Sequence, residues 1–344
     1  MNSLLVTGGA GFIGSCFTLG ALSKGYRVVV LDALTYAGCL ENLAGAQNHD
    51  QFKFIKGDIR DRALADQLLR EYRIDGVINF AAESHVDRSI TGAAPFIETN
   101  ISGTFALLES SLKYWNTLEA SDKKSFRYVQ ISTDEVFGEL GPTGMFSETT
   151  PYAPNSPYSA SKASADLLVR AWFHTFGLPT LVTHCSNNYG PRQYPEKLIP
   201  LMILNALEGK DLPVYGKGEN IRDWIHVEDH CEGILLTLTK GRPGEHYCFG
   251  GRAEKTNISV VKTLCASLDE ARPKKDRTKY ESQIRFVTDR LGHDWRYAID
   301  DSKAEKELGF KRKYGFENGL KQTLAWYLEN KKWIESIRAK GNSK

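Results

Sequence analysis

The 344-residue sequence lacks the features that mark several classes of protein. No apolar run approaches the ~20 residues of a membrane span, and no basic region precedes the first apolar run, so we expect neither a membrane segment nor a signal peptide. The six cysteines show no C-x-x-C spacing, which argues against a zinc site or a disulfide framework and fits a reducing compartment. Positive charge is not in excess either, because 44 Lys and Arg face 42 Asp and Glu. A net charge of +2 argues against a nucleic-acid surface or a polybasic membrane patch, and a cytoplasmic protein is expected.

The first half of the sequence alternates short apolar runs with helix-length segments. Runs that are apolar on both faces are typical of buried parallel strands, and their alternation with helices predicts right-handed crossovers. We therefore predict an α/β fold with a doubly wound parallel Rossmann sheet. The predicted strands are Leu4–Thr7, Arg27–Leu31, Phe52–Ile55, Gly76–Phe80, Arg127–Ser132 and Thr180–His184, and the predicted helices include Phe12–Lys24, Asp61–Tyr72 and Tyr158–Phe176.

After about Gly190 this alternation stops. Loops rich in Gly, Pro and charge separate shorter elements, and one amphipathic helix is predicted near Phe316–Trp333. We predict a dinucleotide-binding domain over residues 1–190 and a smaller mixed substrate lobe over 191–344 at the carboxyl edge of the sheet. The chain is expected to cross back between the two. The sequence contains no internal repeat and no low-complexity tract.

A glycine-rich segment, Gly8–Gly14, follows the first predicted strand and opens the first predicted helix. Gly9, Gly11 and Gly14 satisfy G-x-G-x-x-G, where side chains would keep a pyrophosphate away from the amide groups of the helix N-terminus. Asp32 ends the second strand about 20 residues further on, as this motif requires. Its carboxylate could accept both ribose hydroxyls and would repel a 2′-phosphate, so NAD is favoured over NADP. The alternative is a tight strand–helix turn without a ligand.

Two further strand ends suit the same cofactor. Asp58 and Ile59 follow the third strand, where an adenine amino group would arrive, although an Asp in a turn also serves as a local cap. After the fourth strand, the small residues Ala81 and Ala82 allow a flat ligand to pass close to the backbone.

Tyr158 and Lys162 lie four residues apart in the first turns of a predicted helix and therefore share one face. A tyrosine normally loses its proton near pH ~10. We expect the ammonium group and a positive nicotinamide ring to lower that value, so that the phenolate takes a proton from a sugar alcohol. The alternative for any Y-x-x-x-K pattern is a solvated helix face.

Thr133, Asp134 and Glu135 follow the fifth strand. On a continuing strand the two acids would point to opposite faces, so they share a cavity only if the strand ends there. Gly138 and the Gly141-Pro142 pair predict that it does. Two carboxyl groups in different environments can serve as acid and base; the alternative is loop carboxylates in water.

The sequence resembles the extended short-chain dehydrogenase/reductases, and within them the nucleoside-diphosphate-glucose 4,6-dehydratases. The resemblance runs from Leu5 to about Asn330, and its Thr-Asp-Glu triplet and Asn-Asn-Tyr-Gly-Pro to Pro-Glu-Lys-Leu run are the most specific parts. It is carried by Gly8–Gly14, Asp32–Gly38, Ala81–Ser89, Ser132–Gly138, Tyr158–Lys162, Ser186–Pro191, Pro195–Pro200 and Ile221–Trp224.

This resemblance implies a three-part reaction. Tyr158, with Thr133 at the same oxygen, takes the C4 hydroxyl proton while hydride passes to NAD+. Glu135 then removes the C5 proton while Asp134 protonates the departing C6 hydroxyl, and hydride returns to C6. The product is a 4-keto-6-deoxy sugar and NAD+ is regenerated.

The resemblance also assigns contacts, with no metal among them. The cofactor contacts implied are Gly8, Gly11, Phe12, Ile13, Gly14, Asp32, Ala33, Leu34, Thr35, Asp58, Ile59, Ala81, Ala82, Ser84, Thr99, Tyr158, Lys162 and Asn188. The substrate contacts implied are Ser84, His85, Thr133, Asn187, Lys197, Leu198, Pro213, Tyr215, Arg222, Asn257, Arg290 and His293, with the two arginines as donors to the diphosphate. Phe137, Leu291 and Trp295 depart from the family pattern, the last two near the nucleotide end.

Alternatives stay open at this point. The base of the nucleotide is thymine or uracil, and an NAD-dependent sugar-nucleotide epimerase or decarboxylase would share Tyr158, Lys162 and the cofactor without needing the acid pair. A catalytically idle NAD-sensing regulator would not require the Tyr/Lys pair. The family also suggests a homodimer through helices near Pro95–Lys113 and Tyr158–Phe176.

Overall fold

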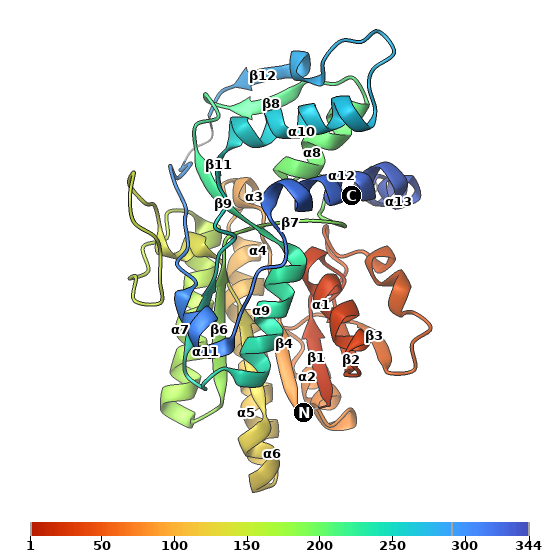
Figure 1. Cartoon of the computed structure of the whole chain (residues 1–344). Helices are drawn as coiled ribbons and strands as arrows, with labels where there is room; N and C mark the ends of the chain where they lie inside the picture. Colours follow the sequence, from red (N-terminus) through yellow and green to blue (C-terminus); the bar gives the residue numbers. More distant parts are fainter. Residues whose placement is uncertain (1, 290–291, 343–344) are drawn as a thin grey trace.

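A seven-stranded parallel sheet forms the centre of the molecule, with the strand order β10-β6-β5-β4-β1-β2-β3 (Figure 1). The computed structural model describes residues 2–289 and 292–342. The predicted doubly wound sheet is confirmed, and each of the six predicted strands ends within one residue of its prediction. The seven strands are β1 (Ser3–Thr7), β2 (Arg27–Asp32), β3 (Phe52–Lys56), β4 (Gly76–Asn79), β5 (Arg127–Ile131), β6 (Thr180–Cys185) and β10 (His246–Phe249).

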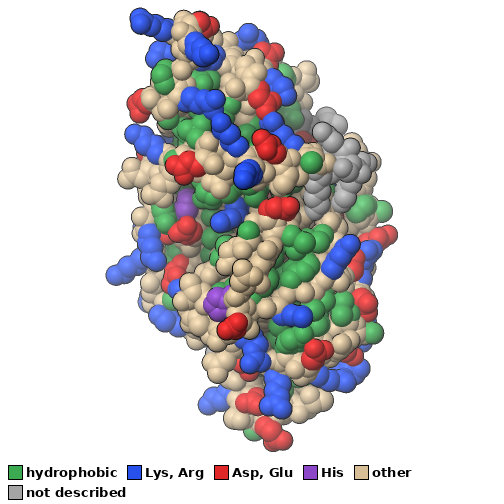
Figure 2. All heavy atoms as spheres, turned by 90° about the vertical axis from the view of Figure 1, so that its right-hand side faces the viewer, with side chains coloured by type: hydrophobic (Ala, Val, Ile, Leu, Met, Phe, Trp, Pro, Cys, Tyr) green, Lys and Arg blue, Asp and Glu red, His purple; other side chains and the backbone are tan. Residues whose placement is uncertain are grey.

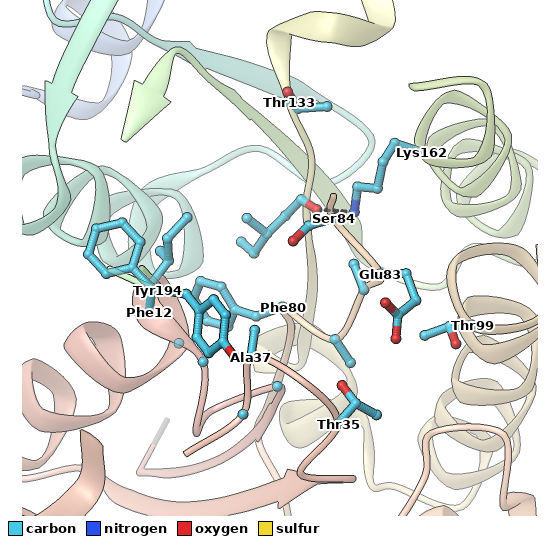
Figure 3. Close-up of a pocket in the computed structure, with 18 of the residues that line it drawn as sticks. Phe12, Thr35, Ala37, Phe80, Glu83, Ser84, Thr99, Thr133, Lys162 and Tyr194 are labelled. Carbon is cyan, nitrogen blue, oxygen red and sulfur yellow. Dashed lines mark hydrogen bonds between the residues drawn. The ribbon is translucent and has the colours of Figure 1, made fainter. Parts of the chain in front are cut away.

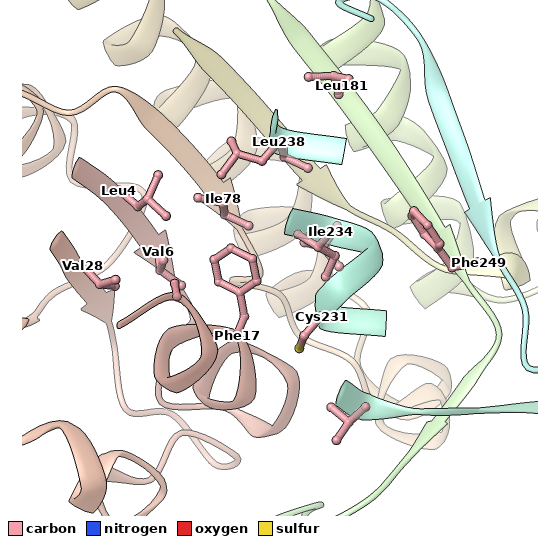
Figure 4. Packing of buried hydrophobic residues seen from close by; sticks show 14 of the residues in the cluster. Leu4, Val6, Phe17, Val28, Ile78, Leu181, Cys231, Ile234, Leu238 and Phe249 are labelled. Carbon is pink, nitrogen blue, oxygen red and sulfur yellow. The ribbon is translucent and has the colours of Figure 1, made fainter. Parts of the chain in front are cut away.

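Alternate residues of each strand pack on opposite faces of this sheet. In β1, Leu4 and Val6 belong to the hydrophobic cluster of one face (Figure 4), whereas Leu5 belongs to that of the other. The first face is covered by α1 (Phe12–Ser23), α9 (Val227–Lys240) and α11 (Ser302–Leu308). The second face is covered by α2 (Arg62–Glu71), α5 (Thr104–Asn116) and α7 (Pro157–Phe176). Both faces are thus buried, which explains the continuous apolar runs of the strands.

Short elements connect these strands and helices. A π-helical turn, η2 (Ile97–Gly103), leads directly into α5. The others are η1 (Leu40–Ala46), α3 (Val86–Thr91), α4 (Ala94–Phe96), α6 (Ala120–Ser125) and η3 (Asp134–Phe137).

A smaller lobe lies above the large sheet in Figure 1. It contains a mixed three-stranded sheet, ordered β11-β9-β7, and a parallel pair of β12 and β8. Its own hydrophobic cluster joins α8, α10, α12 and α13. Its elements are β7 (Asn187–Tyr189), α8 (Leu198–Leu207), β8 (Leu212–Tyr215), β9 (Ile221–His226), β11 (Glu254–Thr256), α10 (Asn257–Ala271), η4 (Tyr280–Gln283), β12 (Ile284–Val287), α12 (Phe316–Glu329) and α13 (Lys331–Asn342).

The C-terminal half differs from the sequence prediction in two ways. The helix predicted near Phe316–Trp333 is two helices, because the chain turns at Asn330, whose side-chain amide donates to the Trp326 carbonyl (2.8 Å). The turn brings the Trp333 ring within 5.0 Å of the Trp326 ring, so both pack in the lobe. The second difference is the strand β10, which was not predicted and which, with α9, belongs to the large sheet and its cover after β9. The division at residue 190 stays a prediction.

In the part of the chain that the structure describes, neither the charged side chains nor the cysteines gather at one place in a way that would indicate a binding site. Figure 2 shows Lys and Arg interspersed with Asp and Glu over one face of the molecule. All six cysteines are free. Over the described ranges, no three His, Cys, Asp or Glu side chains are grouped as metal ligands would be, and no helix is both long and apolar enough to cross a membrane.

Candidate active site

A cleft of about 330 Å³ lies where the carboxyl ends of the parallel strands meet the smaller lobe (Figure 3). Its walls come from the β1–α1 turn, the ends of β2, β4 and β5, the first turns of α7 and the segment from Cys185 to Lys197. All five predicted catalytic residues line it: Thr133, Asp134, Glu135, Tyr158 and Lys162. So does every predicted cofactor contact except Leu34.

The glycine-rich turn forms the floor of this cleft. Gly8 has φ +66°, and a Cβ there would lie 2.7 Å from the Ala81 nitrogen. A Cβ on Gly14 would lie 2.3 Å from the Gly8 carbonyl oxygen, so the turn tolerates no side chain at either position. Gly9, which completed the predicted motif, faces Val30 and does not line the cleft. The lining glycines are Gly8, Gly11 and Gly14, and this bare backbone at the start of α1 fits a pyrophosphate.

Asp32 stands at the end of β2, beside the glycine turn. Its Oδ2 accepts the Ala10 amide and its Oδ1 accepts the Leu34 amide, both at 2.8 Å. Leu34 reaches Asp32 through its backbone in a left-handed conformation (φ 53°), and its side chain packs against the hydrophobic cluster instead of the cleft. A buried carboxylate held in this way fits ribose hydroxyls and opposes a phosphate.

The position of Asp58 is compatible with both of the roles that the sequence left open. It lines the cleft, yet its carboxylate also accepts the Arg60 amide (2.8 Å) and the Arg60 guanidinium. These hydrogen bonds from Arg60 lower the pKa of Asp58. The residue therefore caps its turn as a carboxylate while facing the cleft.

The loop after β4 is fixed by an amide at its back. Asn100, in η2, donates to the Glu83 carbonyl (3.0 Å) and accepts the Glu83 amide (2.8 Å). Its amide also donates to the Ser161 hydroxyl of α7 (2.8 Å). Thr99 and Glu83 consequently face the cleft together, as Figure 3 shows.

The Tyr158–Lys162 pair enters the cleft from a well-capped helix. Ser156 and Ser159 form a reciprocal capping box at the start of α7. Lys162 is buried, and its Nζ donates to the Ile131 carbonyl (2.6 Å), the dashed contact in Figure 3. Burial and then the Glu135 carboxylate raise the pKa of Tyr158 well above its ordinary value, and a hydrogen bond from Thr133 offsets part of this.

Lys162 and a bound nicotinamide ring are together expected from the sequence to lower the pKa of Tyr158, and the polypeptide alone shows only the effect of its own groups. The ammonium group is itself desolvated, which lowers the pKa of Lys162. In the polypeptide alone, loss of water around the phenol outweighs the neighbouring cation.

The acid pair lies where β5 stops, as its flanking residues predicted. The strand ends at Ile131, and Thr133 caps the short η3 turn, its Oγ1 accepting the Glu135 amide and donating to Asp134 Oδ1 (both 3.3 Å). Both acids therefore reach one cleft. Burial, followed by repulsion from Glu135, raises the pKa of Asp134 well above its ordinary value. Asp134 Oδ2 has no hydrogen-bond partner within the described chain, so a protonated Asp134 is placed to donate to a ligand.

Asn188 is oriented by a buried histidine. His230 Nδ1 lies 3.0 Å from Asn188 Oδ1, so the Asn188 amide group points to the Ser186 carbonyl (3.0 Å). Burial lowers the pKa of His230 to about 3, which keeps its ring neutral. The contact explains how a residue outside the cleft holds a predicted cofactor contact in place.

The same burial predicts a pH dependence of stability. An unfolded histidine binds a proton below pH ~6.5, whereas folded His230 does so only near pH 3. The unfolded chain thus binds more protons in this window, and His230 lowers the free energy of unfolding as the pH falls. We expect His230→Gln to reduce the slope of that free energy, measured by urea unfolding between about pH 6 and pH 4, by about 1.4 kcal/mol per pH unit. An identical slope in the variant and the parent protein would contradict this prediction.

Only some of the predicted substrate contacts lie in the cleft. Ser84, Thr133, Asn187 and Lys197 line it, and the Lys197 ammonium donates to the Ser84 carbonyl (3.1 Å). The others lie outside it: His85, Leu198, Pro213, Tyr215, Arg222, Asn257 and His293. Arg290 and the variant position Leu291 fall outside the described residues.

The predicted substrate contacts that lie outside the cleft are spread over several elements. His85 Nδ1 caps α3, Leu198 packs against the core of the smaller lobe, and Asn257 begins α10. Arg222 is buried and donates to the carbonyls of Ile221, Asp294 and Trp295. Pro213 and Tyr215 lie on β8, where the Tyr215 ring is 6.2 Å from that of His293. The cleft therefore holds only part of the predicted substrate contacts, and the others stay predictions.

Several lining residues were not singled out from the sequence. Tyr36 contacts the Ser84 hydroxyl (3.3 Å), and Glu196 lies 3.5 Å from His85 Nε2, with burial raising the pKa of its carboxyl. Cys185 and Tyr194 also line the cleft. Tyr36 and Glu196 belong to motif blocks quoted above, and their position beside predicted contacts was the signal available.

Comparison with known proteins gives consistent results. The family model described as GDP-mannose 4,6 dehydratase matches residues 5–323. The chain is 58% identical over 337 residues to the dTDP-glucose 4,6-dehydratase of Xanthomonas campestris, covering 98% of this chain and 96% of that protein. It is similar to the crystal structure of a dTDP-glucose 4,6-dehydratase from Bacillus anthracis in complex with NAD (TM-score 0.87, 47% identity, 98% and 100% covered). Similarity to a UDP-glucose 4-epimerase from Thermotoga maritima is lower in sequence (TM-score 0.84, 29% identity, 96% and 99% covered).

Proposed function

Because this chain belongs to the nucleoside-diphosphate-sugar 4,6-dehydratases, and among them to the dTDP-glucose 4,6-dehydratase family, we propose how its own residues divide the reaction. The chain is an NAD-dependent hydro-lyase acting on dTDP-glucose, and its product is dTDP-4-dehydro-6-deoxy-glucose. The observation that carries the division is the convergence of Tyr158 with Thr133, Asp134 and Glu135 on one cleft.

The cofactor part of the cleft suits NAD. The glycine turn provides the backbone cradle, Asp32 the carboxylate for ribose, and the loop from Ala81 to Ser84 a narrow wall. When bound, NAD accepts a hydride from C4 of the sugar and later returns it to C6, and its cationic ring favours the phenolate of Tyr158. The hydrogen bond from Lys162 to the Ile131 carbonyl fixes the wall of the cleft next to Tyr158.

Oxidation at C4 is assigned to Tyr158. Its phenol is buried, faces Thr133 and is surrounded by groups that disfavour charge, so a deprotonated form is a strong base. Thr133, whose hydroxyl donates to Asp134 Oδ1 in this structure, is assigned a hydrogen bond to the reacting oxygen once the sugar is bound. Tyr158 takes the C4 hydroxyl proton in this step.

Loss of water is assigned to the acid pair. A ketone at C4 acidifies the C5–H bond, and Glu135 removes that proton. The raised pKa of Asp134 favours its protonated form, to which we assign the proton donated to the departing C6 hydroxyl. An epimerase needs neither group, which supports elimination as the use of this pair. Product mass tests the assignment: dTDP-glucose should lose one water without net reduction of NAD, and an isomer of unchanged mass would contradict elimination.

The diphosphate and base are assigned to the smaller lobe. Lys197 provides a cation in the cleft next to Asn187 and Ser84. Tyr215 and His293 lie further along the lobe on and beside β8, which supports a contact with the nucleotide end. All six cysteines are free, which supports the cytoplasm as the compartment.

A homodimer through α5 and α7 is part of the proposal. These helices contact each other and leave large apolar side chains exposed. Leu167 is 56% and Phe176 47% exposed on α7, and Phe105 is 41% exposed on α5. A second copy packing its own α5 and α7 on this surface would bury them.

Leu167→Glu is therefore expected to convert the dimer to a monomer. The substitution places a charge at the centre of an apolar contact, where it would be desolvated without a partner. Sedimentation velocity measures the change, with Met145→Glu as the matched control, because Met145 is equally exposed (54%) but lies in a loop. A sedimentation coefficient unaffected by Leu167→Glu would exclude this surface.

A further inference from the structure

A buried cluster of polar side chains lies directly behind the proposed catalytic residues. Its centre is Asp166 on α7, which is 1% exposed and does not line the cleft. Asp166 Oδ2 accepts the Ser132 hydroxyl (2.5 Å) and lies 3.3 Å from His184 Nε2 and 3.5 Å from the Tyr152 hydroxyl. His184 Nε2 is in turn 3.0 Å from the Tyr152 hydroxyl. Three chain segments thus converge on one carboxylate.

Ser132 connects this cluster to the reacting groups. It stands between Ile131, whose carbonyl accepts Lys162 Nζ (2.6 Å), and Thr133, which hydrogen bonds to Asp134 and Glu135. The hydrogen bond from Ser132 to Asp166 therefore fixes the peptide units that hold both the lysine and the acid pair. Removing that bond would free the turn at the end of β5.

The Asp166 carboxylate also favours the charged form of Lys162. It lies four residues after Lys162 and so one turn further along the same helix face. Burial lowers the pKa of Lys162, and Asp166 is the largest opposing influence, ahead of Cys185. Asp166 Oδ1 has no hydrogen-bond partner within residues 2–289 and 292–342, so no second donor there neutralises the carboxylate.

The groups around Asp166 come from every neighbouring element. Lys162 lies on its own helix, Ser132 after β5, Tyr152 in the preceding loop and His184 on β6. Behind them, the ring of His246 on β10 lies 5.3 Å from that of His184. Burial and, to a smaller extent, the Asp166 carboxylate raise the pKa of Tyr128 on β5. Among these groups, Lys162 is the cation that shares α7 with Asp166. A change in the charge of Asp166 therefore changes the pKa of Lys162.

We propose that Asp166 is a positioning residue of the dehydratase, which keeps the Lys162 ammonium charged in its buried place and clamps Ser132 so that Thr133 and the acid pair face the sugar. It acts through Ser132 and Lys162 without touching the ligand. The inference rests on the proposed roles of Tyr158 and Lys162.

Asp166→Asn tests the charge. The amide keeps the size of the side chain but removes the negative charge, so Lys162 loses its proton at a lower pH. We expect the alkaline limb of the kcat–pH profile to move to lower pH by about one unit. At neutral pH kcat should fall by less than about tenfold, because the amide oxygen can still accept the Ser132 hydroxyl and only the charge near Lys162 is lost. KM for dTDP-glucose and the NAD dissociation constant from titration calorimetry should change less than twofold.

Ser132→Ala separates clamping from charge. It removes the hydroxyl that Asp166 holds and leaves the carboxylate, so kcat should fall while the alkaline limb stays in place. Asp301→Asn is the matched control for a buried carboxylate, since Asp301 is fully buried but pairs with Arg252 and Arg312 elsewhere. It should lower the thermal unfolding temperature without moving the pH profile.

Each outcome decides the proposal. An unchanged alkaline limb in Asp166→Asn, an equal shift in Asp301→Asn, or parallel losses of kcat and NAD affinity would overturn it. If Asp166→Asn does not fold, Ser132→Ala decides, and an unchanged kcat overturns the clamp. The mass of the product formed by the parent protein tests the proposed function separately, because none of these variants affects that measurement.

Discussion

Tyr158→Phe is expected to abolish turnover of dTDP-glucose, with kcat reduced by about 10³-fold or more. The substitution removes the oxygen that receives the C4 hydroxyl proton and leaves the ring. The ring packs edge-on against Phe96 at 6.3 Å, so the fold of α7 should be retained. Because oxidation at C4 is the first chemical step, no later step proceeds. Mixing the variant with dTDP-glucose in a stopped-flow spectrometer should show no absorbance of reduced nicotinamide at any time.

Tyr128→Phe provides the control for this variant. Tyr128 is also fully buried, and its hydroxyl donates to Gln130 (3.4 Å) away from the cleft. Its loss should reduce stability slightly and leave kcat close to that of the parent protein. Tyr158→Phe protein with more than a tenth of the parent kcat would remove Tyr158 from the mechanism.

Glu135→Gln is expected to reduce dehydration by about 10³-fold while oxidation at C4 continues. The amide cannot take the C5 proton, so the sugar should stop at the ketone. Absorbance of reduced nicotinamide should then rise within one turnover and persist, which distinguishes this variant from Tyr158→Phe. NAD affinity should change less than twofold, because the glycine turn and Asp32 are untouched.

Glu139→Gln is the matched control, since Glu139 follows the same η3 turn but accepts the Trp295 amide and does not line the cleft. It should turn over dTDP-glucose at close to the parent rate. Equal losses of dehydration and of NAD affinity in Glu135→Gln would indicate a structural role for Glu135 instead. Incorporation of solvent deuterium at C5 gives a second, independent measure of the same proton transfer.

The fold of the first half was predictable because its signals are local. Each strand of the parallel sheet is apolar on both faces, and α7 is bounded by Ser156 at its start and by Gly177, which has φ +73°, at its end. Such signals need no knowledge of the rest of the chain. Strand β10 had no comparable signal, because four residues from His246 to Phe249 become a strand only by pairing with β6.

The candidate site likewise has a part that local sequence signals predict and a part that depends on the folded chain. The glycine turn, Asp32 and the Tyr158–Lys162 pair follow from spacing along one element, whereas the cleft position of Glu196 depends on how the smaller lobe packs. Spacing reveals the lysine near Tyr158 but not the depth of burial, which raises the pKa of Tyr158 in the polypeptide alone. Arg222 was expected at the diphosphate, yet its guanidinium donates to backbone carbonyls that only the folded lobe brings near.

The late position of β10 in the sequence has a consequence for biosynthesis. A nascent chain that has emerged only as far as β6 presents that strand to the solvent with one hydrogen-bonding edge unpaired. About sixty further residues must leave the ribosome before this edge of β6 is covered, and they include β7, β8 and β9 of the smaller lobe. The large sheet is therefore not completed as an independent N-terminal unit, and its completion during translation waits for the segment that follows β7, β8 and β9.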